Sequence, residues 1–282
     1  MNICTNRQEM LALSAGWTKD GQTICLVPTM GNLHDGHLSL VEVAAKTGSR
    51  VITSIYVNPL QFAPSEDFDS YPRTTQDDLD KLDATGLCHA VFMPQTMYED
   101  GHATAIKPGG VAEGLESTAR PHFFEGVATV VYQLLVQTGA DKAVFGEKDF
   151  QQLKVIEQMV RDLHMGVEII AAPTMREPDG VAMSSRNGYL NAAQRACAQA
   201  LYQALQEAAE ALRNGTETQT ALTAARQAVL AAGFDTVDYI ELCDAASLAR
   251  HEGLNGPEDG TGAVLLAAAH IGAVRLIDNL RV

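Results

Sequence analysis

The most informative part of the sequence is Leu26-Val-Pro-Thr-Met-Gly-Asn-Leu-His-Asp-Gly-His37, where an apolar run leads through a loop into a helix. Residues 23–27 predict a buried strand, and residues 37–46 have the apolar spacing of a helix. In an open α/β sheet, ligands bind beyond the carboxyl ends of the strands, where helix N-termini offer N–H groups to phosphate. The stretch therefore predicts a phosphate-binding loop.

The loop itself carries two histidines, His34 and His37, whose spacing of three places them on one face of a first helical turn. Imidazoles at that position can hydrogen-bond phosphates and stabilise the charge on a departing pyrophosphate. Gly31 and Gly36 let the backbone approach a ligand closely. The alternative is an ordinary loop with exposed histidines, which the bare spacing allows. Its place between strand and helix favours a motif that resembles HxGH of the nucleotidyltransferase superfamily.

Outward from this stretch, strands and helices alternate through the first two-thirds of the chain. We predict strands at residues 50–56, 88–93, 142–145 and 167–171, and helices at residues 74–85, 126–138 and 150–163. Such alternation is typical of a parallel sheet with helices on both faces. The fold class is therefore α/β, with a Rossmann-like, doubly wound N-terminal domain over residues 1–175.

The pattern changes after the turn-rich residues 176–188, where alanine-rich helices precede strands. We predict helices at residues 192–213 and 218–232, strands at residues 236–242, 263–269 and 274–278, and a Gly/Pro/acidic loop at residues 252–262. Helices followed by strands indicate a smaller α+β C-terminal domain over residues 176–282. A hinge near residues 173–188 would let this domain close over a nucleotide.

Composition excludes several classes of function. The 282 residues contain 20 Lys+Arg against 35 Asp+Glu, a net charge of −15, so we expect no nucleic-acid partner. No apolar run reaches about 18 residues, so we expect no membrane span. Residues 10–16 are too short for a leader peptide. The five scattered cysteines include no CxxC pair, which favours a reducing cytoplasm.

Three further segments carry polar groups suited to ligands. In Phe145-Gly-Glu-Lys-Asp-Phe-Gln-Gln152, Lys148 suits a phosphate, and Asp149 suits a ribose hydroxyl or orients the lysine. Taken alone, this segment is better explained as a surface turn that caps a helix. Met183-Ser-Ser-Arg-Asn187 resembles a phosphate clamp, with a polar hinge between domains as the alternative. In Tyr56-Val-Asn-Pro-Leu-Gln-Phe62, neutral amides suit hydroxyls and a carboxylate, or else form a simple Asn-Pro turn.

Taken together, these segments resemble the pantothenate synthetase (pantoate–β-alanine ligase) family over essentially the whole chain. The matching segments, in family order, are PTMGNLHDGH, YVNPLQF, YPRT, FGEKDFQQ and MSSRN. The resemblance implies ATP-dependent condensation of pantoate with β-alanine to pantothenate, in pantothenate and coenzyme A biosynthesis. It implies a pantoyl-adenylate intermediate, release of AMP and pyrophosphate, Mg²⁺ with the ATP, and a cytoplasmic homodimer formed through the N-terminal domain.

The resemblance also implies site residues. Catalytic roles fall on His37, usually given as the proton donor, and on His34, Lys148, Ser184, Ser185 and Arg186. The ATP-binding residues would be Met30, Gly31, Asn32, Leu33, His34, Asp35, Gly36, His37, Gly146, Glu147, Lys148, Asp149, Met175, Met183, Ser184, Ser185 and Arg186. Pantoate and β-alanine would meet Gln61, Gln152 and Asn58. No protein ligands of Mg²⁺ are implied.

Some residues stay open at this point. Where relatives often read Arg-Pro-Gly-His-Phe, this chain has Arg120-Pro-His-Phe-Phe124, so we give His122 no catalytic role and expect a loop residue. Glu125 stands where some relatives carry a basic residue. Asp77 and Asp78 are either Mg²⁺ ligands or, more simply, a solvated helix face.

Three rival functions remain to be tested. They are a nucleotidyltransferase that stops at an activated product, a nucleotide-binding regulatory module, and a class I aminoacyl-tRNA synthetase.

Overall fold

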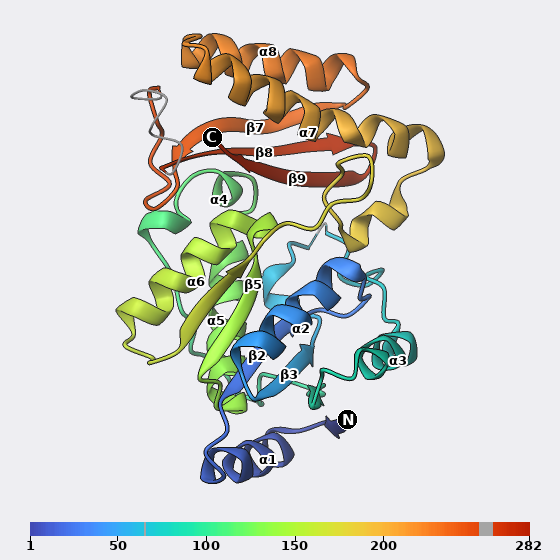
Figure 1. Cartoon of the computed structure of the whole chain (residues 1–282), viewed down its shortest axis with the longest axis vertical. Helices are drawn as coiled ribbons and strands as arrows, with labels where there is room; N and C mark the ends of the chain where they lie inside the picture. Colours follow the sequence, from blue (N-terminus) through green and yellow to red (C-terminus); the bar gives the residue numbers. More distant parts are fainter. Residues whose placement is uncertain (65, 254–261) are drawn as a thin grey trace. The chain divides into compact units, whose positions relative to one another are not determined.

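A computed structural model describes residues 1–64, 66–253 and 262–282, and the chain forms two compact units (Figure 1). The first unit comprises residues 1–147 and 152–173, and the second comprises residues 148–151 and 174–282. The sequence predicts a division after residue 175, with residues 148–151 in the first part. Most of the predicted loop at residues 252–262 lies outside the described residues.

The first unit is built on a six-stranded sheet in the order β1-β4-β3-β2-β5-β6. All of its strand pairs are parallel. The strands are β1 (Asn2–Cys4), β2 (Ile24–Thr29), β3 (Arg50–Ile55), β4 (Ala90–Phe92), β5 (Lys142–Gly146) and β6 (Glu168–Ala172). The predicted α/β class is confirmed, because the sheet runs parallel and consecutive strands are joined through helices.

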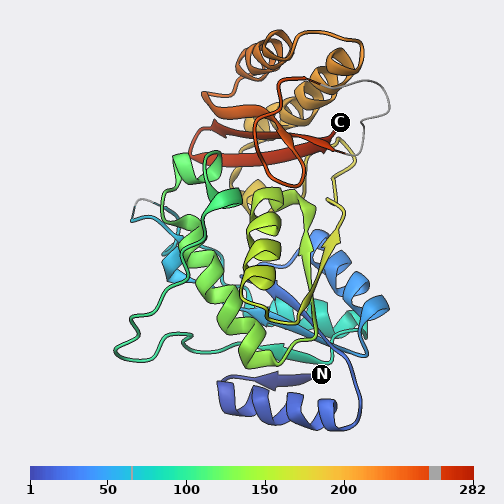
Figure 2. The ribbon, with the colours of Figure 1, turned by 90° about the vertical axis from the view of Figure 1, so that its left-hand side faces the viewer.

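Side chains of β2 alternate between the two faces of this sheet, and each face is covered by helices. Ile24 and Leu26 pack in a core with α1, α5 and α6, whereas Cys25 and Val27 pack in a second core with α2 and α3. Figure 2 shows α5 and α2 on opposite sides of the sheet. The helices are α1 (Arg7–Lys19), α2 (Asp35–Thr47), α3 (Thr75–Thr85), α4 (Glu116–Ala119), α5 (Phe123–Thr138) and α6 (Phe150–Asp162).

The order of the strands reverses between β2 and β5, which are neighbours in the sheet. From β2 the chain proceeds to β3 and β4 on one side, then crosses to β5 and β6 on the other. Ligands of open α/β sheets bind at such a switch point, outside the carboxyl ends of the strands. The topology of the sheet therefore predicts a ligand-binding site at the residues that follow Thr29 and Gly146.

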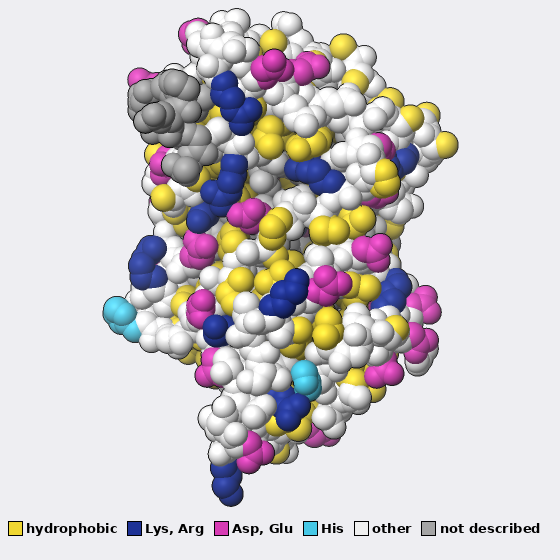
Figure 3. All heavy atoms as spheres, viewed as in Figure 1, with side chains coloured by type: hydrophobic (Ala, Val, Ile, Leu, Met, Phe, Trp, Pro, Cys, Tyr) yellow, Lys and Arg dark blue, Asp and Glu magenta, His cyan; other side chains and the backbone are white. Residues whose placement is uncertain are grey.

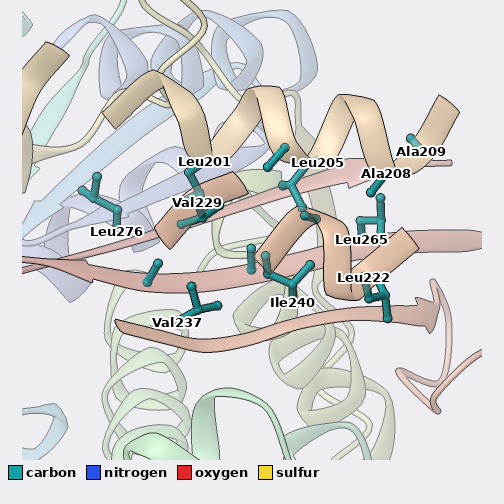
Figure 4. Packing of buried hydrophobic residues seen from close by; sticks show 14 of the residues in the cluster. Leu201, Leu205, Ala208, Ala209, Leu222, Val229, Val237, Ile240, Leu265 and Leu276 are labelled. Carbon is teal, nitrogen blue, oxygen red and sulfur yellow. The ribbon is translucent and has the colours of Figure 1, made fainter. Parts of the chain in front are cut away.

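The second unit contains an antiparallel sheet in the order β7-β8-β9, with α7 and α8 packed on one face. Figure 4 shows Leu201, Leu205 and Leu222 of the helices meeting Ile240 and Leu265 of the sheet. Its elements are α7 (Ala192–Arg213), α8 (Thr218–Ala231), β7 (Thr236–Asp244), β8 (Ala263–Ile271) and β9 (Val274–Arg281). The predicted helices and strands of this part are all present.

The first two elements, β1 and α1, are absent from the sequence prediction. Within the described residues, no helix combines the length and apolar character needed to cross a membrane. Figure 3 shows acidic and basic side chains interspersed on the face in view, with no continuous basic stripe there.

Candidate active site

The loop that follows β2 has a backbone that few side chains tolerate. Gly31 has a φ of +81° and Asn32 a φ of +50°, both in the left-handed region. A Cβ at Gly31 would lie 3.0 Å from Oδ2 of Asp78 and 3.1 Å from Cγ2 of Ile55. Glycine is therefore required at position 31 both by conformation and by space.

Asp78 of α3 holds this loop in place. Its Oδ2 accepts a hydrogen bond from the N–H of Asn32 at 2.9 Å, and its Oδ1 accepts one from the N–H of Leu33 at 2.7 Å. Lys81, one turn further along α3, donates its Nζ to the carbonyl of Leu33 at 2.6 Å. A carboxylate that accepts two backbone N–H groups in this way fixes the backbone of the loop.

The expectation of a solvated helix face is wrong for Asp78, which is 1% exposed, and holds for Asp77, which is exposed. Asp78 shares a helix face with the buried Leu82, four residues on, and this spacing was the signal available in the sequence. The two hydrogen bonds to the loop give this buried carboxylate a role other than holding a metal.

The two histidines come together as predicted, at the start of α2. His34 is the N-cap residue, and the ring centroids of His34 and His37 are 4.0 Å apart. Nδ1 of His37 accepts a hydrogen bond from the N–H of His34 at 3.3 Å. Since Nδ1 is an acceptor, the proton of a neutral His37 ring resides on Nε2. The site thus offers a ring N–H donor at a helix N-terminus.

Gln61 lies beside the same loop, at the end of the short helix η1 (Pro59–Gln61). Its Nε2 is 3.0 Å from Sδ of Met30, and its Oε1 accepts from Nδ2 of Asn58 at 3.2 Å. Asn58 is 1% exposed and is the N-cap residue of η1. Met30, Asn58 and Gln61 are therefore brought together. Among the described residues, Gln152 of α6 shares no hydrogen bond with Gln61.

At the end of β5, Gly146 is followed by the short helix η3 (Glu147–Asp149) and then by α6. Nζ of Lys148 lies 3.5 Å from Oδ2 of Asp149, and both side chains are partly exposed. In the second unit, Asn279 of β9 donates its Nδ2 to the carbonyl of Lys148 at 2.9 Å. The backbone that carries Lys148 is thus held by a residue at the far end of the chain, which sequence reasoning missed.

The segment with the predicted phosphate clamp is folded as a tight reversal in the second unit. Arg176 and Ala182 form an antiparallel bridge, and the N–H of Met183 donates to the carbonyl of Met175 at 2.9 Å. Ser184 then caps the helix η4 (Ser185–Tyr189), its Oγ accepting from the N–H of Arg186 at 3.3 Å. The structure therefore places Met175 next to Met183.

Arg176 ties this reversal to β9. Its guanidinium donates to both carboxylate oxygens of Asp278, at 2.7 and 2.8 Å, and to the carbonyls of Gly180 and Asn279. The guanidinium also lies 3.5 Å from the ring centroid of Tyr202. Asp278 is 3% exposed in its side chain, so this is a buried, bidentate ion pair.

Neither a disulfide nor a cluster of potential metal ligands is found among the described residues. The five cysteines form no disulfide. Burial raises the pKa of the thiols of Cys25 and Cys88, and raises the pKa of Cys243 to about 12. These three thiols stay protonated at neutral pH and are poor nucleophiles. Within residues 1–64, 66–253 and 262–282, no group of three His, Cys, Asp or Glu side chains is placed to hold a metal ion.

The segment that departs from the family pattern leads into α5. His122 is exposed and occupies the N-cap position of this helix, while Glu125 is half-buried in its first turn. His122 thus stands at a helix start rather than within a longer loop.

The fold and the loop at residues 30–37 define an α/β nucleotide-binding protein of the HxGH type. Comparison with known proteins then gives the family. The pattern of the family described as pantoate-beta-alanine ligase matches residues 2–281, and the chain belongs to this family of enzymes.

Curated relatives agree with this assignment. Pantothenate synthetase of Caulobacter vibrioides is 49% identical over 276 residues, covering 97% of this chain and 96% of the relative. That of Mesorhizobium japonicum is 50% identical over 268 residues, covering 94% and 92%.

Solved structures agree as well. Pantothenate synthetase from Thermus thermophilus has a TM-score of 0.91 and 38% identity, covering 100% of this chain and 99% of its own. Pantoate-beta-alanine ligase from Francisella tularensis, complexed with beta-gamma ATP and beta-alanine, has a TM-score of 0.83 and 32% identity, covering 100% and 97%.

Proposed function

We propose that this chain condenses pantoate with β-alanine to form pantothenate, using ATP and releasing AMP and pyrophosphate. It is a ligase by family, and two of the substrates, ATP and β-alanine, are those bound in the Francisella tularensis relative. The observation that carries the proposal is the loop after β2, where a buried carboxylate shapes the backbone and paired imidazoles begin a helix.

The ATP would be bound by two sets of residues. In the first unit, residues 30–37 would contribute the two histidines at the start of α2, together with Gly146 and Glu147 at the end of β5. In the second unit, Lys148, Asp149, Met175 and residues 183–186 offer an ammonium, a carboxylate for the ribose, two hydroxyls and a guanidinium. Clustering of basic groups on this site would offset the net charge of −15 toward an anionic substrate.

The first step would activate the carboxylate of pantoate. One of its oxygens attacks the α-phosphorus of ATP in line, the bond from that phosphorus to the bridging oxygen breaks, and pyrophosphate leaves. Nε2–H of His37, together with His34, Lys148 and Arg186, would donate to the phosphate oxygens as negative charge develops. Positioning and electrostatic stabilisation supply most of the rate in such transfers.

The second step would form the amide. The neutral amine of β-alanine attacks the acyl carbon of pantoyl adenylate, the bond to the AMP oxygen breaks, and the nitrogen loses a proton. Adenylation is needed because an unactivated carboxylate would have to expel oxide. No nucleophilic side chain is required, in agreement with the raised thiol pKa values of Cys25, Cys88 and Cys243.

Mg²⁺ is part of the proposal as the companion of the ATP phosphates, which bind it together with several waters. Both carboxylate oxygens of Asp78 already accept N–H groups of the loop, so we assign this residue to the loop and not to the metal. We further propose that the enzyme works in the cytoplasm, where its five free cysteines stay reduced, and that it forms a homodimer through its N-terminal domain.

The test incubates the purified chain with ATP, Mg²⁺, pantoate and β-alanine and analyses the products. AMP, pyrophosphate and pantothenate should appear in equal amounts, and omitting pantoate should abolish pyrophosphate release. ADP in place of AMP would refute the adenylate mechanism. A nucleotidyl group retained on the product would favour a nucleotidyltransferase, and ATP binding without pyrophosphate release would favour a regulatory module.

A further inference from the structure

Behind Gln61 lies a buried polar network centred on Asn58, which is 1% exposed. Its Nδ2 donates to Oε1 of Gln61 at 3.2 Å and to the carbonyl of Gly126 at 3.1 Å. Its Oδ1 accepts from the hydroxyl of Tyr98 at 2.8 Å and from the N–H of Leu60 at 3.3 Å. The whole hydrogen-bonding capacity of the Asn58 amide is therefore used within the protein.

Two backbone groups decide which way the Asn58 amide faces. The N–H of Leu60 can only donate and the carbonyl of Gly126 can only accept, so Oδ1 must face the former and Nδ2 the latter. Helix α5 approaches closely here, since any Cβ at Gly126 would overlap the carbonyl oxygen of Leu60. The amide of Asn58 has one allowed orientation.

The orientation of the Asn58 amide fixes that of the Gln61 amide. Because Asn58 presents an N–H group, Gln61 has to turn its carbonyl oxygen inward, and its Nε2 is left on the other side, 3.0 Å from Sδ of Met30. A thioether is a weak hydrogen-bond acceptor, so a ligand oxygen would be a better partner for the N–H groups of Gln61. The group that Gln61 offers to a ligand is a donor.

Tyr98 is the outer member of the network. Its hydroxyl donates to Oδ1 of Asn58, and burial raises the pKa of this hydroxyl, so it stays protonated. Its ring packs near the imidazole of His102, with centroids 4.9 Å apart, and against the core of the first unit. Tyr98 is therefore held by its ring while its hydroxyl supports the amide of Asn58.

We propose that Tyr98 is a positioning residue for substrate binding, acting through Asn58 to hold the amide of Gln61 as a donor toward a carboxylate or hydroxyl oxygen of the acid substrate. The inference rests on the proposed function, and on the expectation from the family resemblance that Gln61 binds pantoate. It adds that Gln61 recognises an acceptor atom, and that a residue outside the substrate contacts sets this preference.

The test is Tyr98→Phe, which removes the hydroxyl and keeps the ring. KM for pantoate should rise about fivefold, the scale of one lost neutral hydrogen bond, while kcat and KM for ATP change less than about twofold. Tyr132→Phe is the matched control, because Tyr132 packs against the same core and takes no part in this network. It should leave all three constants unchanged.

A double-mutant cycle with Gln61→Ala shows whether Tyr98 acts through Gln61. In the Gln61→Ala background, Tyr98→Phe should change KM for pantoate less than about twofold. An equal rise in both backgrounds, or an equal rise for ATP, would overturn the inference. Wild-type enzyme that releases no pyrophosphate with pantoate would instead overturn the proposed function, so the two failures are distinguishable.

Discussion

The two segments proposed to bind ATP, residues 30–37 in the first unit and residues 175–186 in the second, are anchored by charges of opposite sign. Asp78 accepts hydrogen bonds from backbone N–H groups of the first segment. Arg176 donates to a backbone carbonyl of the second segment and pairs with Asp278. In the first case the anchor is far away in sequence from the loop it holds, and in the second it belongs to the segment and reaches to a distant strand.

This difference shows that a binding motif and its support are separate features of the chain. The side chains of a binding motif have to match the chemistry of the ligand. The anchors, Asp78 and Arg176, instead have to match the backbone N–H and carbonyl groups that a tight turn leaves unpaired inside the protein. An anchor is buried and paired, so losing it should affect folding and geometry. A motif side chain faces the ligand, so losing it should affect turnover. Measurements of stability and of turnover therefore distinguish the two kinds of residue.

The largest effect should follow from Arg176→Met, which leaves Asp278 buried without its partner. We expect the free energy of unfolding to fall by about 3–5 kcal/mol, as for other broken buried pairs. Urea denaturation followed by circular dichroism measures this change. Arg213→Met, at the exposed end of α7, is the control and should be neutral. Equal stability of the two variants would show that Arg176 anchors nothing.

The next effect concerns the motif side chains. His37→Ala in the first unit and Lys148→Ala in the second should each lower kcat by about 100- to 1,000-fold, the cost of removing one preorganised donor. Pyrophosphate release gives kcat, and a circular dichroism spectrum confirms that the variants are folded. Near-normal turnover in folded His37→Ala enzyme would refute its catalytic role.

A smaller effect is expected at the other anchor. Asp78→Ala leaves two buried N–H groups without their acceptor, so the free energy of unfolding should fall by about 1–3 kcal/mol, and KM for ATP should rise because the loop loses its shape. Asp78→Asn keeps one acceptor and should lie between the variant and the wild type. Asp77→Asn is the matched control, since its side chain is exposed. An Asp78→Ala enzyme with unaltered KM for ATP would contradict the anchoring role.

Most helices and strands were predictable because their signals are local. Helix α3 ends at Thr85, the predicted end, because Gly86 follows it with a φ of +63°. Helix α2 begins two residues before the predicted start because His34 provides the cap. Strand β1 was missed because three residues at a sheet edge carry too little pattern. Helix α1 has a usable signal in Asn6, whose side chain accepts from the N–H of Glu9, but its apolar stretch was considered only as a leader peptide.

The candidate site divides in the same way. Residues that would touch a ligand stand in recognisable segments, as with His34 and His37 after an apolar strand. Residues that support these side chains from within the protein have no recognisable sequence pattern. Asp78 looked like one of several exposed acids on a helix, and Asn58 looked like a ligand residue, although its amide is fully used by protein groups.

Three features can be predicted from the amino-acid sequence alone: the alternation of strands and helices, the glycine-bearing loop after β2, and the family that the chain resembles. These follow from periodicity and from residue chemistry at short range. The charged side chains that support the proposed site can be recognised only in the folded structure, because a buried backbone N–H or carbonyl pairs with whichever group the fold brings near it. For the N–H groups of Asn32 and Leu33 the partner is Asp78, more than forty positions away along the chain. It lies on α3, whose polar sequence is typical of a solvent-exposed helix.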